Sequence, residues 1–190
     1  FNIIDFGASA NGVTDCTNAF KSAIEECSKN GGGMVYVPEG IFLTGAIHLK
    51  SNVNLHLAEN SVIKFSDDKT KYLPLVFSRW EGVECMNYSS LIYAYGQENI
   101  AITGKGILDG QGSATNWWPW KGKKDEGGWK EGEPHQKAGR DKLFEMAENN
   151  ISPEERIMGE GFYLRPNFVQ FYKTKNILIE GVTFKDSPMW

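Results

Sequence analysis

Residues 175–184 read KNILIEGVTF, and this short stretch decides which fold the sequence can adopt. Apolar residues occupy odd positions before Gly181 and even positions after it, so the two halves cannot share one face of a single straight strand. The chain must bend at the glycine for both apolar sets to face the same interior. The stretch therefore predicts part of a coil in a solenoid rather than one long strand.

The same pattern occurs at two earlier places in the chain. Each copy begins with an asparagine, which is followed by alternating apolar residues, a short break and a second apolar pair; the asparagines are Asn52, Asn99 and Asn176. From Asn52 to Asn99 the spacing is that of about two solenoid repeats at the lower end of the usual range, roughly 20–25 residues each. The longer gap to Asn176 indicates an insertion between coils.

An asparagine at the same corner of successive coils has a physical reason. Its side-chain amide can bond to backbone groups in a turn, tolerates a left-handed conformation and can stack on the equivalent amide of the next coil. We therefore expect the three asparagines to form a ladder. The alternative is that they occupy three unrelated turns.

One amphipathic helix is predicted ahead of the coils, over positions 17–29. Its apolar residues fall on one face at helical spacing, and they are Ala19, Phe20, Ala23, Ile24 and Cys27. Asp15 or Thr17 can cap its start, and Asn30 with the three glycines that follow ends it. A solenoid needs covered ends, so we expect this helix to be the N-terminal cap.

From Met34 onward the sequence changes to short β-branched and aromatic runs separated by Gly, Asn, Asp or Pro, which is typical of strands. The expected strands span 34–37, 41–44, 46–49, 53–57, 62–65, 91–95, 100–103, 168–172, 177–179 and 182–184. The expected fold class is all-β. No segment supplies a second cap after the last strand, so we expect the natural protein to continue beyond Trp190.

Composition narrows the classes of function. The 190 residues can bury a core, and the net charge of -4 gives no general reason to expect a nucleic-acid partner. No apolar run approaches the roughly 20 residues of a membrane-spanning helix. Cys16, Cys27 and Cys85 show no spacing typical of a disulfide framework or a zinc site. We expect small, buried cysteines, no metal or other cofactor, and no membrane or nucleic-acid partner, and the oligomeric state stays open.

Residues 113–162 form the expected insertion within one β-helical domain spanning 1–190. Four of the six tryptophans lie there together with a group of lysines: Trp117, Trp118, Trp120 and Trp129, with Lys121, Lys123, Lys124 and Lys130. Flat aromatic faces stack on sugar rings and cationic side chains meet carboxylates, so this composition suits an acidic saccharide. The alternative is that the tryptophans pack against the solenoid as a satellite core. Helices are expected over 140–149 and from Ser152.

Hydrolysis of a glycosidic bond needs two carboxyl groups on either side of it. Asp67 and Asp68 lie in a polar turn, Asp109 lies in a glycine-rich corner, and Asp186 precedes Ser-Pro. None has a partner on an equivalent coil, so we interpret each as structural. His48 and His56 alternate with apolar residues and are expected to face outward, whereas His135 lies in the insertion.

Several motifs in order resemble the polygalacturonases of glycoside hydrolase family 28, within the pectate-lyase-like superfamily. They are FGA at 6–8, Asp15, GGMVYVPEG at 32–40, GKGILDGQG at 104–112, LRP at 164–166 and DSPMW at 186–190. The resemblance spans nearly the whole chain. The opening motifs are shared across the superfamily, and the later ones point to polygalacturonases.

The resemblance implies a right-handed parallel β-helix and an exo-acting, inverting hydrolysis of galacturonan or rhamnogalacturonan in pectin. It implies no metal, a secreted or periplasmic location, and an acidic plant polysaccharide as the partner. The catalytic acids of that family follow the Ser-Pro-x-Trp segment, so none is carried over and we expect this chain alone to be inactive. The candidate substrate-binding residues are Trp117, Trp118, Lys121, Arg165 and Trp190.

Two other functions use similar scaffolds. A pectate lyase would need Ca²⁺ held by a carboxylate cluster, and no such cluster is evident in the sequence. A non-catalytic β-helix of the adhesin or tailspike kind would bind a polysaccharide without cleaving it. The glycoside hydrolase is favoured because the motifs occur in order and the insertion combines tryptophan with lysine.

Overall fold

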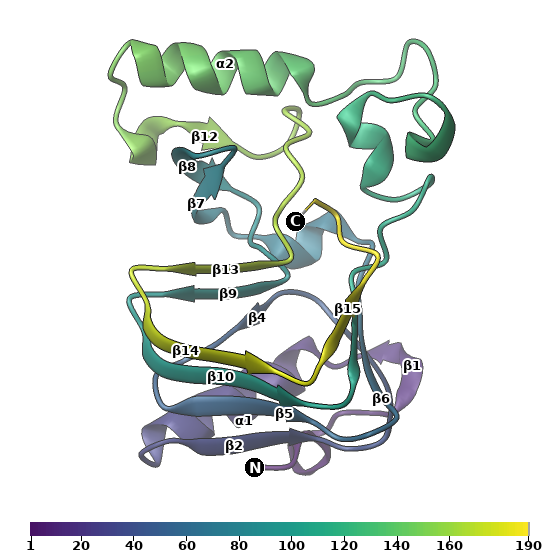
Figure 1. Ribbon diagram of the computed structural model, residues 1–190, viewed down its shortest axis with the longest axis vertical. Coiled ribbons are helices and arrows are strands. Elements are labelled where there is room, and N and C mark those ends of the chain that lie inside the picture. Colours follow the sequence, from purple (N-terminus) through teal and green to yellow (C-terminus); the bar gives the residue numbers. More distant parts are fainter. Residues whose placement is uncertain (190) are drawn as a thin grey trace.

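The computed structural model describes residues 1–189, in which short strands wind into stacked coils below a separate layer of loops and helices (Figure 1). The 3₁₀ helices are labelled η. In chain order the elements are η1 (Ile3–Phe6), β1 (Asn11–Asp15), α1 (Thr17–Lys29), β2 (Gly33–Val37), β3 (Gly40–Thr44), β4 (Ile47–His48), β5 (Val53–Leu57), β6 (Ser61–Phe65), η2 (Lys69–Tyr72), β7 (Val76–Trp80), β8 (Val83–Asn87), β9 (Ile92–Tyr95), β10 (Glu98–Gly104), β11 (Ile107–Asp109), η3 (Trp118–Lys121), η4 (Asp125–Gly127), α2 (Lys137–Glu148), η5 (Pro153–Glu155), β12 (Ile157–Met158), β13 (Val169–Tyr172), β14 (Lys175–Glu180) and β15 (Thr183–Lys185).

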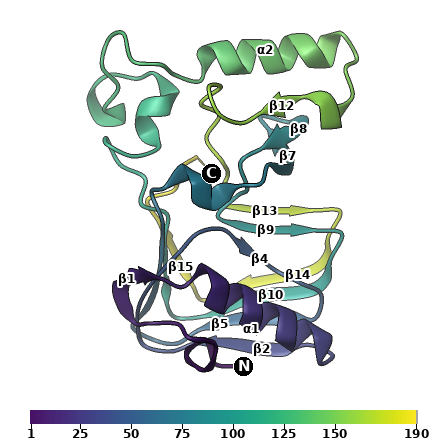
Figure 2. The same ribbon diagram turned by 180° about the vertical axis from the view of Figure 1, so that it is seen from behind.

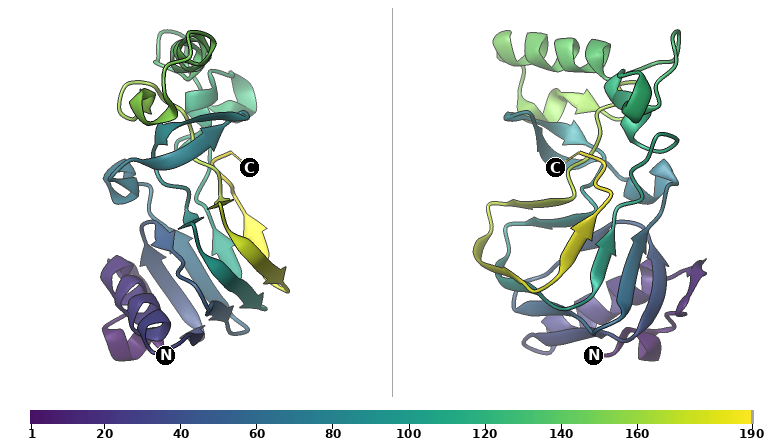
Figure 3. Two further views of the ribbon diagram at one scale, coloured as in Figure 1. Left: turned by 90° about the vertical axis from the view of Figure 1, so that its left-hand side faces the viewer. Right: turned by 45° about the vertical axis from the view of Figure 1, so that its right-hand side comes forward.

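Three parallel sheets form the walls of the coils. The strand orders are β1-β3-β6-β11-β15, β14-β10-β5-β2 and β13-β9-β4. The consecutive strands β9, β10 and β11 pair with β13, β14 and β15 in the same sequence, so each coil lies on the preceding one (Figure 3). The expected all-β class is confirmed, and its pairing is mostly parallel.

The asparagine ladder is confirmed atom by atom. The side-chain amide of Asn99 donates to the amide oxygen of Asn52 at 2.9 Å, and that of Asn176 donates to Asn99 at 2.8 Å. All three residues have a left-handed backbone, with φ of 64°, 55° and 57° in chain order. The three turns are therefore equivalent corners of the coils rather than unrelated loops.

The bend expected at Gly181 is also present, with φ of 82°, and it separates β14 from β15. A Cβ atom on Gly181 would collide with the carbonyl oxygen of Gly104, and one on Gly104 would collide with that of Leu57. Successive coils thus approach backbone to backbone at this corner. Only glycine fits, because it combines a positive φ with the absence of a side chain.

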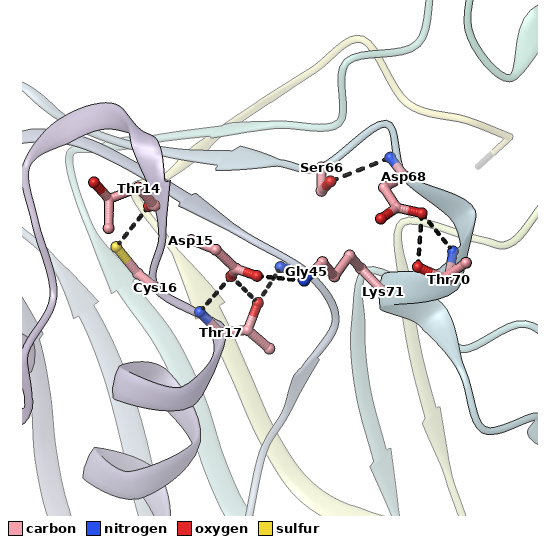
Figure 4. A network of polar contacts seen from close by, with 9 residues as sticks. All are labelled: Thr14, Asp15, Cys16, Thr17, Gly45, Ser66, Asp68, Thr70 and Lys71. Atoms are coloured by element: carbon pink, nitrogen blue, oxygen red, sulfur yellow. Dashed lines mark hydrogen bonds and ion pairs between the residues drawn. The ribbon is translucent and has the colours of Figure 1, made fainter.

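Helix α1 has the expected bounds and buries the five predicted apolar residues. It lies beside the first coils, against β2 and β4 (Figure 2). The carboxylate of Asp15 accepts a hydrogen bond from the Thr17 N–H at 2.9 Å and forms an ion pair with the Lys71 ammonium at 2.6 Å (Figure 4). The ion pair joins the start of the helix to η2. Burial raises the pKa of Asp15, but the hydrogen bonds from Lys71 and Thr17 outweigh it and hold that pKa below its usual value.

The core runs through the middle of the coils. Val35, Leu55, Ile102 and Leu108 are fully buried, and the three cysteines are buried free thiols, as expected. The last coil differs, because every residue of β14 and β15 is exposed.

Five strands that were not among the expected ranges are present: β1, β7, β8, β11 and β12. Strands β7 and β8 form an antiparallel hairpin outside the coils. The hairpin is fixed to the β13-β9-β4 sheet, because the Tyr93 hydroxyl donates to the Phe77 carbonyl at 2.7 Å and the Ser78 hydroxyl donates to Gln170 at 2.7 Å. This hairpin is the platform on which the insertion rests.

Candidate functional site

The insertion is an ordered layer rather than a loose loop. Its strand β12 pairs with β8 of the hairpin, and helix α2 lies across the top of this layer (Figure 1). A second small core joins the two parts and contains Trp80, Cys85, Leu143, Met158 and Leu164. The expected helix begins at Lys137, three residues earlier than predicted, and the segment after Ser152 is a single 3₁₀ turn.

Trp117 lies inside the aromatic junction between the insertion and the coils. Its ring is 5.4 Å from that of Tyr72 and 5.1 Å from that of Trp120, both edge to face, and the side chain is 1% exposed. The Lys69 ammonium lies 3.6 Å from the centre of the same ring. With its faces covered in this way, Trp117 offers no open surface for a sugar, which agrees with the satellite-core alternative for this residue.

Lys69 is the most unusual charge at the junction. Its ammonium donates to the Asp67 carbonyl at 2.9 Å and to the Asn116 side-chain oxygen, and it is 5.6 Å from the Trp120 ring. No carboxylate of residues 1–189 lies within ion-pair distance of it. Burial lowers the pKa of Lys69 to about 8, although Asp67 and Asp68 oppose the shift. The side chain is half-buried, and its closest contacts are neutral oxygens and an aromatic ring rather than a carboxylate.

A cavity of about 460 Å³ lies at this junction, and Lys69 is one of the residues that line it. Its lining includes Lys69, Tyr88, Trp120, Glu160 and Tyr163. The Trp120 ring centre is 5.4 Å from that of Tyr163 and 6.1 Å from that of Tyr88, so three aromatic rings share the wall. The size lies within the range of small-molecule sites. Burial raises the pKa of Tyr88, with Glu160 and Tyr163 adding to the effect, so its phenol keeps its proton.

Two predicted site residues meet at the segment 186–189. The indole N–H of Trp118 donates to the Ser187 carbonyl at 2.9 Å, and the Arg165 guanidinium donates to the Pro188 carbonyl at 2.8 Å. Arg165 is 7% exposed and also donates to the Gln136 side chain at 3.3 Å. Burial lowers the pKa of Arg165, and Glu81 opposes this shift. Both side chains therefore fix the backbone of this segment.

Asp109 has a structural explanation, as the sequence pattern suggested. Its carboxylate pairs with Lys185 of the next coil at 2.8 Å and accepts the Gln111 N–H at 3.1 Å. Burial raises the pKa of Asp109, but the hydrogen bonds from Lys185 and Gln111 outweigh it and lower that pKa overall. Asp68 likewise accepts the Thr70 N–H at 2.9 Å at the start of η2 (Figure 4).

The three histidines make hydrogen bonds or ring contacts with nearby side chains. His48 and His56 face outward, as expected, and bond to Ser89 at 2.9 Å and Thr103 at 2.8 Å. His135 packs edge to face against Trp129 in the insertion. Burial lowers the pKa of His48, with Lys50 and Lys21 adding to the effect, so this ring favours its neutral form.

The predicted site residues thus have different surroundings. Trp117 is in the core, Trp118 and Arg165 converge on Ser187 and Pro188, Lys121 is exposed at the end of η3, and Trp190 lies outside the described residues. Lys69, Tyr88 and Tyr163 were not predicted. Lys69 looks in sequence like part of a solvated turn, and only the fold brings it to the aromatic cavity.

No group of three or more histidine, cysteine, aspartate or glutamate side chains within 1–189 is arranged to hold a metal ion. Among the helices of that same range, none has the length and apolar character needed to cross a bilayer.

Comparison with known proteins gives consistent matches. The family model for rhamnogalacturonase A/epimerase, pectate lyase-like, matches residues 1–117. A probable polygalacturonase of Vitis vinifera is 31% identical over 100% of this chain, which covers 33% of that protein. An exo-poly-α-D-galacturonosidase of Dickeya chrysanthemi is 35% identical over 58% of this chain and 19% of its own length.

Among solved structures, an exopolygalacturonase of Thermotoga maritima superposes with a TM-score of 0.97 at 57% identity. That match covers 100% of this chain and 42% of the other chain. The chain therefore spans less than half the length of these relatives. The expected likeness to polygalacturonases and to parallel β-helical structures is confirmed.

Proposed function

The chain belongs to the rhamnogalacturonase A/epimerase, pectate lyase-like family, and from this we propose that it serves a pectin-degrading glycoside hydrolase of the polygalacturonase type. The observation that carries the proposal is the match with the Thermotoga maritima exopolygalacturonase. It extends over the entire chain, and its TM-score of 0.97 means that the insertion is included as well as the coils. A loop layer that rests on a hairpin outside the coils is thus common to both.

Exo action is the mode that this insertion favours. A thick layer beside a saccharide cleft can close one end of it, so that a chain enters by its terminus rather than by its middle. In this chain residues 113–162 form an ordered layer held by pairing between β12 and β8, and we propose that it closes one end of the cleft. The proposed domain organisation is therefore one right-handed β-helical domain, covered at its start by α1 and interrupted by this insertion.

The proposed chemistry is inverting hydrolysis of galacturonan or rhamnogalacturonan linkages. One carboxylic acid protonates the leaving oxygen, and a carboxylate about 6.5–9.5 Å from it activates a water. We place both groups on coils that follow Trp190, as the resemblance implies. Two carboxylates of this chain are paired with lysines, Asp15 with Lys71 and Asp109 with Lys185. Their negative charge is neutralised, and they support the coils rather than act in catalysis.

The proposed partner is an acidic plant polysaccharide, which fits a secreted or periplasmic enzyme. Lys121 and Trp190 are proposed to contact it directly. Trp118 and Arg165 are proposed to act by holding residues 187 and 188, through the bonds of 2.9 Å and 2.8 Å described above. Trp117 contributes as the aromatic partner of Lys69.

The test is product analysis with a protein that includes the coils after Trp190. Incubation with polygalacturonate should release saturated galacturonate, with inversion at the new reducing end and with equal rate in the presence of a chelator. Unsaturated products that require Ca²⁺ would identify a lyase instead. Binding of polygalacturonate or rhamnogalacturonan with no release of reducing sugar would identify a non-catalytic polysaccharide-binding protein.

A further inference from the structure

We infer that the cavity between η2 and the insertion is a binding site for one uronic acid residue, whose carboxylate pairs with the ammonium of Lys69. The inference rests on the proposed function for its choice of sugar. It goes further by assigning a particular site to the substrate class, on residues that neither the family motifs nor the tryptophan pattern indicate.

The first argument is that Lys69 has no carboxylate partner among residues 1–189. A buried ammonium is stabilised by a carboxylate partner, by hydrogen bonds or by an aromatic face. Lys69 has a carbonyl at 2.9 Å, the Asn116 side-chain oxygen and the Trp117 ring at 3.6 Å, but no carboxylate of residues 1–189 in ion-pair range. A carboxylate entering the adjacent cavity would supply the missing counter-charge.

The second argument is the shape and lining of the space. A cavity of about 460 Å³ accommodates a single pyranose with several waters, and its wall carries the rings of Tyr88, Trp120 and Tyr163. Aromatic rings provide the apolar contact that the C–H face of a sugar needs, and the tyrosine hydroxyls can bond to sugar hydroxyls. A plain inorganic anion would leave these rings without a partner.

The third argument is that the charges lining the cavity favour one orientation of a bound acidic sugar. Lys69 is half-buried, whereas Glu160, which also lines the cavity, is exposed. An acidic sugar is therefore attracted at the inner side and repelled at the outer side. This arrangement orients the carboxylate toward η2, and it disfavours a ligand with a second acid group near Glu160.

The test uses the chain as given and two matched ligands, D-galacturonate and D-galactose, which differ only at C6, where the first has a carboxylate and the second a hydroxymethyl group. Binding is measured by titration calorimetry for the native chain, for Lys69→Met and for the control Lys71→Met. We expect galacturonate to bind at least tenfold more tightly than galactose, and Lys69→Met to abolish this preference. Lys71 lies in the same 3₁₀ helix but pairs with Asp15, so Lys71→Met should leave the preference unchanged.

A second measurement needs no substitution. Acetylation of lysines in the native chain, followed by peptide mass spectrometry, should show Lys69 protected at least threefold by galacturonate but not by galactose or acetate, with Lys71 unprotected. Equal protection by acetate, or none by galacturonate, would overturn the inference. If that happened while a longer protein still released galacturonate from polygalacturonate, the proposed function would stand and only this site would be wrong.

Discussion

The side-chain amide of Asn176 donates a hydrogen bond to the amide oxygen of Asn99, 2.8 Å away and 77 residues earlier in the chain. Asn99 in turn donates to Asn52, so one residue both donates and accepts within the ladder. The backbone of Asn99 is left-handed, with φ of 55°. Its side chain and its backbone conformation therefore contribute separately to the same corner.

Substitution at Asn99 should separate these two contributions. Asn99→Ala loses both amide bonds and places a Cβ-bearing residue with little tolerance for positive φ in the corner, so we expect the free energy of unfolding to fall by about 2–3 kcal/mol. Asn99→Gly loses the bonds but accepts the backbone, and should cost about 1 kcal/mol less than alanine. Urea denaturation measures both. A glycine variant less stable than the alanine variant would contradict this explanation.

Gly104 should be far more sensitive than a glycine in open space. A Cβ atom there collides with the backbone of Leu57, whereas one on Gly96, whose φ is also positive, meets nothing within 4 Å. Gly96→Ala therefore reports the backbone cost alone, about 1 kcal/mol. We expect Gly104→Ala to lower the free energy of unfolding by at least about 2 kcal/mol more, because two packed coils must separate. Similar losses for the two variants would show that the coils can adjust.

The depressed pKa of Lys69 predicts a pH effect of a definite sign. The unfolded chain keeps this lysine protonated up to its ordinary value near 10.4, while the folded chain releases the proton near pH 8. The unfolded state thus binds more protons between these values, and stability rises with pH in that window. The groups that face the ammonium or line the same cavity are Asp67, Asp68, Tyr88, Asn116, Trp117, Trp120, Glu160 and Tyr163.

The measurement is the difference in unfolding free energy between the native chain and Lys69→Met from pH 7 to 10.5. We expect the native chain to gain stability relative to the variant over this range. Lys71 provides a control of opposite sign, because its hydrogen bond to Asp15 raises its pKa. Stabilisation by Lys71 should be fully present below its ordinary pKa near 10.4 and be lost only as pH rises through its higher folded pKa, so the Lys71→Met difference should stay nearly constant from about pH 7 to 10. A flat difference for Lys69→Met would mean that its ammonium is solvated.

Asp109, at the end of β11 before the insertion, should contribute to the free energy of unfolding in a way that depends on pH in the acid range. Its pKa is lowered overall in the folded chain, so its contribution is complete above its ordinary value near 3.9 and disappears as pH falls through the folded value. Asp109→Asn removes the pair with Lys185, and we expect a loss of about 1–3 kcal/mol at pH 7. The loss should shrink toward pH 2, as followed by thermal unfolding at each pH. A loss that stayed constant with pH would point to packing rather than charge.

The coils were predictable because their determinants are local and repeated. The asparagines, the glycine bend and the apolar face of α1 can each be recognised within a dozen residues. The hairpin of β7 and β8 was missed, because its turn at Glu81 and Gly82 lacks the Asn-Gly or Asp-Gly pair that usually marks one.

The candidate site was less accessible to prediction. The tryptophan cluster was recognised, but which ring is buried depends on how the insertion meets η2. Lys69 and Tyr163 are far apart in sequence, and neither belongs to a periodic pattern. Their proximity is a property of tertiary packing, so the aromatic cavity could be found only in the folded chain.

The asparagine ladder has a further consequence for how such a chain can change. Each amide bonds to the amide of the neighbouring coil and so fixes the register between the two coils. That register does not depend on how many residues lie between them in the sequence. Asn99 and Asn176 stay in register although the whole insertion lies between them. New sequence can therefore accumulate between two coils without shifting the register of the coils that follow, so a protein with this fold can change its loops while its sheets stay aligned.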